Sequence, residues 1–121
     1  MALPVNRPLS EASVSAYMVD ISTASSAFVV SPWRGKITRV YSVISGAITS
    51  ADAVWTLEIN GTAVTGVSVT VANSGSAAGD VDSGIPTALN TVNEGDTIEF
   101  VSDGASSTAI IANFTAVIER D

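Results

Sequence analysis

The segment at residues 55–61 constrains the fold more than any other part of the chain. Over residues 55–59, apolar side chains alternate with Thr56 and Glu58, which is the period of a strand with one buried face. Asn60-Gly61 follows at once, and this dipeptide suits a type I′ turn because both of its residues must adopt positive φ. The segment therefore predicts an antiparallel β-hairpin, and it supplies no chemistry that would define a function.

Length and composition limit the classes of protein to which the chain can belong. At 121 residues and 12.3 kDa, it is long enough for one domain with one core. It has no cysteine and no histidine, which excludes disulfides, Cys/His zinc sites and catalysis by Ser-His-Asp or Cys-His groups. No run approaches the ~18 apolar residues of a membrane span, and the N-terminus lacks the layout of a signal peptide. We therefore expect a soluble protein that is made inside the cell.

The charged residues are distributed unevenly along the sequence. Twelve acidic and 5 basic residues give a net charge of −7, and such a surface repels phosphate, so we expect no nucleic-acid partner. Arg34, Lys36 and Arg39 lie close together, whereas no basic residue occurs between Gly61 and Glu119. The cluster predicts one basic spot suited to an acidic protein neighbour, and solvated strand ends are the alternative. A mean hydropathy of +0.40 further predicts apolar surface that an assembly would cover.

The first fifteen residues differ from the rest of the chain. Residues 1–15 contain two prolines and show no sustained hydrophobic period, which predicts an extended N-terminal arm before a single domain over residues 16–121. Leu3, Val5 and Leu9 are apolar, and this favours an arm that docks on a neighbouring subunit over a frayed terminus.

Beyond the arm, short runs separated by Gly, Asn and Asp turns predict about eight strands. They are expected at residues 16–21, 27–30, 36–44, 54–59, 63–71, 80–85, 97–102 and 108–119, with a bulge at Gly66. The expected large core residues are Trp55, Phe100, Phe114, Tyr17 and Tyr41. Residues 36–44 and 108–119 carry apolar groups on both faces, which is typical of strands covered on both sides. The pattern predicts an all-β fold, an antiparallel β-sandwich or jelly roll.

Trp33 is the aromatic residue with the clearest functional potential. It follows Pro32 at the start of a strand and precedes Arg34. An exposed Trp-Arg pair is typical of an interface anchor, and a platform for stacking a sugar is a weaker version of the same idea. A tryptophan that covers one end of the core is the alternative interpretation.

Paired acidic residues are the other candidates for chemistry. Asp80 and Asp82 lie two positions apart, and Glu94 and Asp96 flank Gly95. Calcium requires several loop oxygens, but neither pair has the ligand spacing of a helix-loop-helix site. Carboxylate pairs also serve glycoside hydrolysis, but the chain has too few aromatic residues to line a cleft. We therefore expect no catalytic residue, no cofactor and no metal site, and a chain that is not an enzyme.

Several segments resemble small β proteins of tailed-bacteriophage virions, above all the capsid decoration (cement) proteins. The segments are residues 32–37 (PWRGKI), 40–43 (VYSV), 48–53 (ITSADA), 57–61 (LEING) and 92–100 with its Asn-Glu-Gly-Asp turn. The resemblance implies a jelly-roll-like subunit that forms a homotrimer on the outer surface of a capsid shell. It also implies a virion protein made in the host cytoplasm, with the major capsid protein as partner and an N-terminal arm that reaches adjacent subunits.

On this hypothesis, the contacts with the capsid or with other subunits come from the arm and from the Trp-Arg pair. The expected interface residues are Leu3, Pro4, Arg7, Leu9, Trp33 and Arg34. A carbohydrate- or receptor-binding module of a phage fibre or adhesin is the alternative function. A calcium-dependent adhesin built on Asp80 and Asp82 is a third hypothesis.

Overall fold

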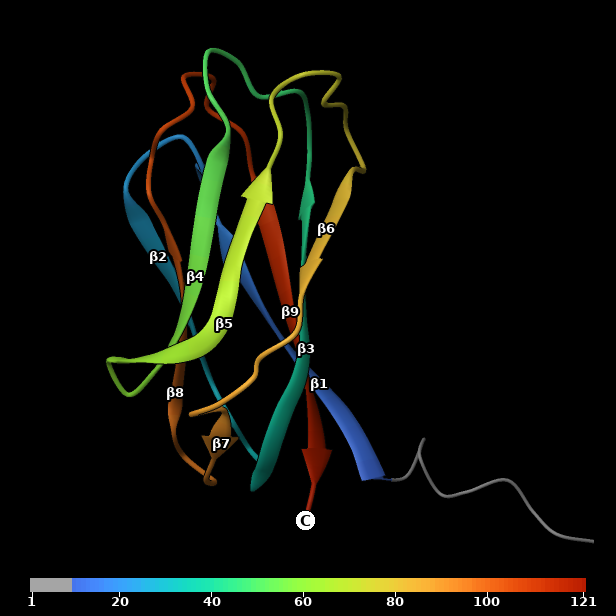
Figure 1. The fold of residues 1–121 in the computed structure, drawn as a ribbon, viewed down its shortest axis with the longest axis vertical. Coiled ribbons are helices and arrows are strands. Elements are labelled where there is room, and N and C mark those ends of the chain that lie inside the picture. Colours follow the sequence, from blue (N-terminus) through green and yellow to red (C-terminus); the bar gives the residue numbers. More distant parts are fainter. Residues whose placement is uncertain (1–9) are drawn as a thin grey trace, which may run out of the picture.

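The computed structural model describes residues 10–121, which form two packed antiparallel sheets (Figure 1). The strands are β1 (Glu11–Met18), β2 (Ser25–Val30), β3 (Gly35–Ile44), β4 (Ala53–Ile59), β5 (Thr62–Val71), β6 (Val81–Gly84), β7 (Thr91–Val92), β8 (Thr97–Ser102) and β9 (Ala112–Arg120). Sheet A has the order β1-β9-β3-β6, with β7 also paired to β3, and sheet B has the order β2-β8-β4-β5. Residues 11–121 contain no helix, and the predicted all-β antiparallel sandwich is confirmed.

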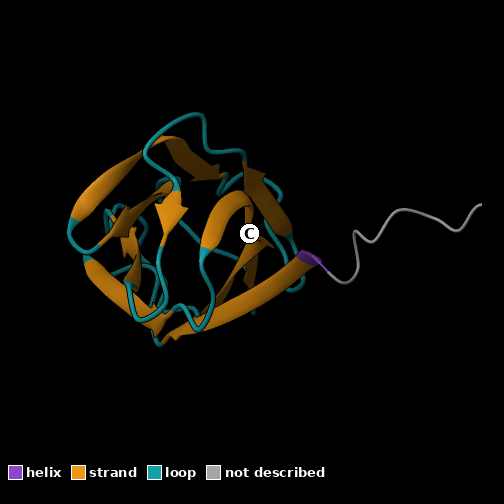
Figure 2. Cartoon of the chain, turned by 90° about the horizontal axis from the view of Figure 1, so that it is seen from below, coloured by secondary structure: helices purple, strands orange, loops and turns teal. Residues whose placement is uncertain are grey.

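The two sheets enclose one hydrophobic core. Figure 2 views the sandwich from below, with strands around the interior. β1 lies next to β2 at one side of the sandwich and β5 next to β6 at the other, so the edges of the two sheets meet. The expected arm residues Leu3, Pro4, Arg7 and Leu9 lie outside the described residues.

The predicted hairpin is confirmed. β4 and β5 pair as antiparallel neighbours, and Asn60 and Gly61 have φ values of 50° and 83°, as a type I′ turn requires. Gly66 has a φ of 91°, and the β4–β5 register shifts between Thr56 and Glu58, opposite the part of β5 that contains this glycine. The bulge bends β5 across the front of the sandwich in Figure 1.

Three aromatic residues form the centre of the core. The ring centroids of Trp55 lie 5.0 Å from those of Phe114 and 5.9 Å from those of Phe100, and the two phenylalanine rings stack at 4.9 Å. All three are fully buried. The indole Nε1 of Trp55, in sheet B, donates a 3.1 Å hydrogen bond to Oγ of Ser42, in sheet A, so the buried N–H has an acceptor.

The expected start of the first strand was placed too late. β1 begins at Glu11, so residues 11–15 belong to the sheet, although we predicted them in the arm. Within β1, Val14, Ala16 and Met18 point inward and Tyr17 is 56% exposed, so the predicted core position of Tyr17 is wrong. Tyr17 was expected on the inner face because Ile21, four residues later, continues the same alternation. Ile21 is buried, but it lies in the turn after the strand, so it does not share a face of β1 with Tyr17.

Tyr41 was also wrongly predicted in the core. The register between β3 and β9 shifts between Ile37 and Arg39, which is the signature of a bulge. After this shift Val40, Ser42 and Ile44 point inward, and Tyr41 turns to the outer face of sheet A. An extra residue in a strand reverses the orientation of everything beyond it, because the side-chain period is two.

Candidate functional site

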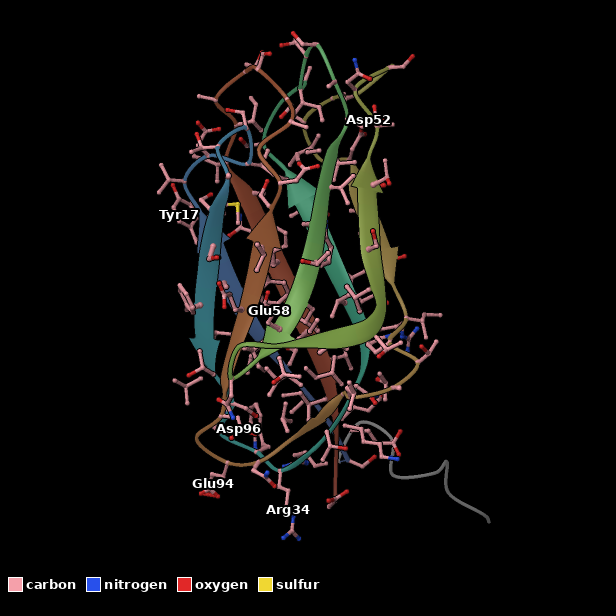
Figure 3. The ribbon with its side chains drawn as sticks, turned by 60° about the vertical axis from the view of Figure 1, so that its left-hand side comes forward. Tyr17, Arg34, Asp52, Glu58, Glu94 and Asp96 are labelled. Atoms are coloured by element: carbon pink, nitrogen blue, oxygen red, sulfur yellow. The ribbon has the colours of Figure 1, made fainter. Side chains whose placement is uncertain are left out.

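The candidate site lies at the lower end of the sandwich in Figure 1, where β3 begins and β9 ends. A shallow depression of about 490 Å³ opens there. Its lining residues are Pro32, Trp33, Arg34, Asn93, Glu94, Arg120 and Asp121. Figure 3 shows Arg34 and Glu94 pointing away from the body at this end.

Ser31 holds the loop that carries Trp33. Its side chain is fully buried, and its Oγ donates to the carbonyl oxygen of Trp33 at 2.7 Å. The backbone N–H of Ser31 donates to the carbonyl oxygen of Asp96, and the N–H of Gly95 donates to the carbonyl oxygen of Ser31. These bonds join residues 31–34 to the turn at residues 93–96, so the two walls of the depression are fixed to each other.

Asp96 fixes the second turn. Its carboxylate accepts hydrogen bonds from the backbone N–H of Asn93 at 2.7 Å and from the side-chain amide of Asn60 at 3.0 Å. These bonds lower the pKa of Asp96, and the bond from Asn93 has the larger effect. The hairpin turn at Asn60 and the turn beside the depression are therefore connected through one carboxylate.

Trp33 combines the two roles that the sequence left open. Its side chain is partly buried and packs against the core, and it also lines the depression. The guanidinium carbon of Arg120 lies 6.0 Å from the centre of the Trp33 ring, at the limit of a cation–π contact. Nε of Arg120 is buried without a hydrogen-bond partner.

Arg34 is available to a partner. Its side chain is 68% exposed, and its Nε lies 3.5 Å from Oδ2 of Asp121, whose side chain is 58% exposed. A pair this exposed contributes little to stability, because water and salt screen it. Arg34 and Asp121 therefore present opposite charges at the rim of the depression.

The basic residues of the described chain gather near this end. Arg34 and Lys36 lie at the start of β3, Arg39 follows on the same strand, and Gly35 pairs with Arg120 of β9. Glu94, Glu119 and Asp121 lie among them, so the lower end carries both signs of charge. The predicted basic cluster is present, mixed with carboxylates rather than isolated.

The loops at the upper end use their acidic side chains for a different purpose. Asp20, Asp52, Asp80 and Asp103 each accept a hydrogen bond from a backbone N–H within these loops or the adjoining strand. Hydrogen bonds from the side chain and backbone of Ser22 lower the pKa of Asp20. These carboxylates satisfy backbone donors that would otherwise depend on water.

Asp80 and Asp82, the residues of the calcium hypothesis, are close in space but have different surroundings. Oδ2 of Asp80 accepts from the N–H of Ala77 at 2.9 Å. Burial raises the pKa of Asp82, and the neighbouring charge of Asp80 raises it further. Among residues 10–121, no group of three or more acidic, His or Cys side chains could hold a metal ion.

Only part of this site was predicted from the sequence. Trp33 and Arg34 do lie together in the depression, whereas Asn93, Glu94, Arg120 and Asp121 were not predicted to join them. The pairing of Gly35 with Arg120 brings the last residues of β9 beside Arg34. No local sequence motif indicates a contact between strands that lie so far apart in the sequence.

No protein-family model and no curated protein sequence matches the chain. Solved structures do match, with low sequence identity. The catalytic unit of a GH87 α-1,3-glucanase from Streptomyces thermodiastaticus has a TM-score of 0.55 and 15% identity, and the match covers 92% of this chain but only 26% of that chain. A CBM35 domain from Cellvibrio japonicus Abf62 has a TM-score of 0.52 and 13% identity, with 84% and 74% covered.

A chain from the capsid asymmetric unit of cyanophage Pam1 is also similar. It has a TM-score of 0.53 and 17% identity, and the match covers 100% of this chain and 93% of that chain. Identities this low establish a common fold and nothing finer. The fold is therefore a β-sandwich of the kind found in carbohydrate-binding modules and in a phage capsid. Within residues 10–121, no helix has the length and apolar character that crossing a membrane requires.

Proposed function

We propose that this chain is a structural virion protein, a head decoration (cement) protein that binds the outer surface of a tailed-phage capsid as a homotrimer. The observation that carries the proposal is the end-to-end likeness to a chain of the cyanophage Pam1 capsid asymmetric unit. Because the match covers nearly all of both chains, that capsid chain is about as long as this one. The glucanase match, in contrast, covers about a quarter of its chain.

The lower end is the docking surface in this proposal. Trp33 and Arg34 lie there, and β1 begins there, because Glu11 pairs with Glu119 near the end of β9. The described part of the chain therefore begins, at Ser10, at the end that carries the basic residues. The upper end, where the acidic side chains hold the loops, faces away from the shell.

Attachment gains strength from repetition on the shell. A single depression with exposed, screened charges binds weakly, but a trimer that engages several sites at once gains affinity through effective concentration. The role requires no catalytic group, and we propose that the protein is not an enzyme. The contacts are apolar and electrostatic, so binding weakens as ionic strength rises.

The test is sedimentation of the purified protein with capsid shells prepared without it. Wild type binds to saturation at a fixed number of copies per shell. Removal of residues 1–9 abolishes binding and leaves the fold intact, whereas a deletion through Ser15 would also remove five of the 8 residues of β1. Trp33→Ala and Arg34→Ala weaken binding. Asp52→Asn is the matched control, because it changes a charge at the opposite end (Figure 3).

Each outcome of that experiment supports or contradicts a specific part of the proposal. Absence of saturable binding by wild type contradicts the decoration role. Full binding by the truncated protein removes the arm from the docking surface and leaves the role itself in place. Equal losses for Trp33→Ala and Asp52→Asn would show that the lower end is not the docking surface.

A carbohydrate-binding module is the second candidate, and the surroundings of Trp33 favour it. An aromatic ring bordered by an amide, two carboxylates and two guanidiniums provides a stacking surface and hydrogen-bonding groups for hydroxyls. The CBM35 likeness supports this candidate through the fold. Specific binding on a glycan array that Trp33→Ala removes, together with no binding to shells, would establish it over the decoration role.

A further inference from the structure

The outer face of sheet A carries apolar side chains on each of the strands β1, β9, β3 and β6. Tyr17 of β1 and Val81 of β6 are 56% and 62% exposed, at the two edges of the face. Between them, Val117 of β9 and Tyr41 and Val43 of β3 also point outward and are partly exposed. We call these five residues the sheet A patch. Figure 3 shows Tyr17 at the outside of the sandwich.

Nothing in the described part of the chain covers this patch. The strands of sheet A contact their sheet neighbours and, at the two edges, β2 and β5. Strands that are apolar on both faces are typical of sheets covered on both sides. β3 and β9 have this pattern, yet within residues 10–121 only their inner faces are covered. The unpaired apolar face therefore points to a partner outside the single chain.

The register places the outward residues of sheet A in cross-strand rows. From the upper to the lower end, the rows are Tyr17-Asn113-Val43-Val81, then Ser15-Thr115-Tyr41-Ser83, then Ser13-Val117-Arg39, then Glu11-Glu119-Lys36-Thr91. The upper row is largely apolar and the lowest row carries charges of both signs. In the lowest row, Glu119 on β9 lies between Glu11 on the edge strand β1 and Lys36 on the central strand β3.

We infer that this face packs against the same face of a second copy, about a two-fold axis that runs parallel to the strands between β9 and β3. This axis exchanges β9 with β3 and β1 with β6 while keeping each row at its own level. Glu119 of each copy then faces Lys36 of the other copy, so the interface contains this contact twice. Tyr17 faces Val81 in the same way. Aligned packing of two sheets is a common arrangement in sandwiches.

Other arrangements lack this contact between Glu119 of one copy and Lys36 of the other. A two-fold axis perpendicular to the strands would place Lys36 and Glu119 against the apolar upper row, which buries their charges with no charged partner from the other copy. Sheet B is a poorer surface for such a pair, because Glu58 and Glu99 stand directly opposite each other on its outer face. Stacking of sheet A on sheet B joins opposite sides of the sandwich, and that contact does not close.

Mixing two charge variants tests the inference directly. In Lys36→Glu, like carboxylates meet across the axis, and in Glu119→Lys, like ammonium groups meet there. Each variant alone should self-associate about tenfold or more weakly than wild type at low salt. An equimolar mixture should pair again, because every carboxylate then faces an ammonium group. Mixing cannot restore a contact within one chain, so recovery identifies an intermolecular contact, and unfolding midpoints verify that both variants fold.

The readout is the mass in solution by light scattering, measured without capsids. Wild type should contain an even number of copies, either twice the 12.3 kDa chain or a hexamer if the proposed trimer also forms. A monomer or a lone trimer overturns the two-fold pairing, and so does a mixture that stays dissociated. Polymers that grow with concentration indicate stacking of sheet A on sheet B and overturn it as well. None of these results bears on capsid attachment, which the sedimentation experiment tests separately.

Discussion

The outer faces of the two sheets share one architecture and differ in charge. Each has an exposed aromatic residue on an edge strand, Tyr17 on β1 of sheet A and Phe28 on β2 of sheet B, with exposures of 56% and 62%. On sheet A, Glu119 lies between Glu11 and Lys36, whereas on sheet B Glu58 lies beside Glu99 and the outward residues of its strands include no basic one. Apolar exposure therefore does not distinguish the faces, whereas the presence of basic residues on the outer face of sheet A does.

This difference between the two faces shows how a chain with a net charge of −7 can still present a surface suited to a second copy. The basic residues among residues 10–121 are concentrated near one end of sheet A rather than spread over both faces. Repulsion between copies is then weakest where sheet A faces sheet A in register. Glu58 and Glu99 on sheet B would repel the same residues of a second copy placed against that face.

The largest expected effect comes from placing a charge in the sheet A patch. Tyr17→Glu should weaken self-association by about 3–5 kcal/mol, because it buries a carboxylate with no partner. Phe28→Glu is the matched control, with a similar exposure on the opposite face, and its mass should stay that of wild type. Equal dissociation by both variants would erase the distinction between the two faces.

A change inside the core should separate stability from association. Ser42→Ala removes the acceptor of the Trp55 Nε1 hydrogen bond and should cost about 1–3 kcal/mol of unfolding free energy, since a buried donor is left unpaired. Urea unfolding measures the loss, and light scattering of the folded protein should still report pairing. Ser68→Ala, on the exposed side of β5, should leave both quantities unchanged.

Removing one charge from each face should change the stability of the fold in opposite directions. Glu58→Gln relieves a cross-strand pair of like charges and should stabilise the fold by about 0.2–1 kcal/mol. Lys36→Gln removes the attractive neighbour of Glu119, which then lies beside Glu11 alone, and should destabilise the fold by a similar amount. Both changes in unfolding free energy should become smaller in high salt, because Glu58 and Glu99 are partly exposed and Lys36 and Glu119 are exposed, so salt screens both pairs. A gain or a loss on both faces would contradict the charge argument.

The smallest effect concerns Asp82, at the edge of sheet A. Its pKa is raised by burial and by Asp80, so the folded state holds this proton more tightly than the unfolded state. Stability therefore falls as pH rises from the unfolded pKa through the folded one. Asp82→Asn should raise the Tm at pH 7, and the difference from wild type should disappear below about pH 3, where both states bind the proton. A lower Tm for Asp82→Asn at pH 7 would show that the charged form is stabilised instead.

The sequence predicted the parts of the fold whose signals are local. Asn60-Gly61 specified its turn because the required φ values belong to those two residues, and the alternation at residues 97–102 matched β8 to the residue. The phase of β1 was missed because Ile21 continues the alternation into a turn. The orientation of Tyr41 was missed because a bulge leaves no compositional mark in β3.

The candidate site was less predictable than the fold for a related reason. Trp33 and Arg34 are adjacent in sequence, so their association required no knowledge of pairing. Arg120 and Asp121 join them only through the register of β3 with β9. The sheet A patch was hinted at by apolar groups on both faces of residues 36–44 and 108–119. That pattern indicates a covered face without identifying what covers it.

The amount of this chain in purified phage particles tests the decoration role most directly. On the proposed role, quantitative mass spectrometry of tailed-phage particles that carry this chain should find a fixed ratio of the chain to the major capsid protein. Brief protease treatment of intact particles should then remove the chain and spare the shell, because the proposed location is the outer surface. Absence of the chain from particles, or its presence only in fibre fractions, would contradict the account.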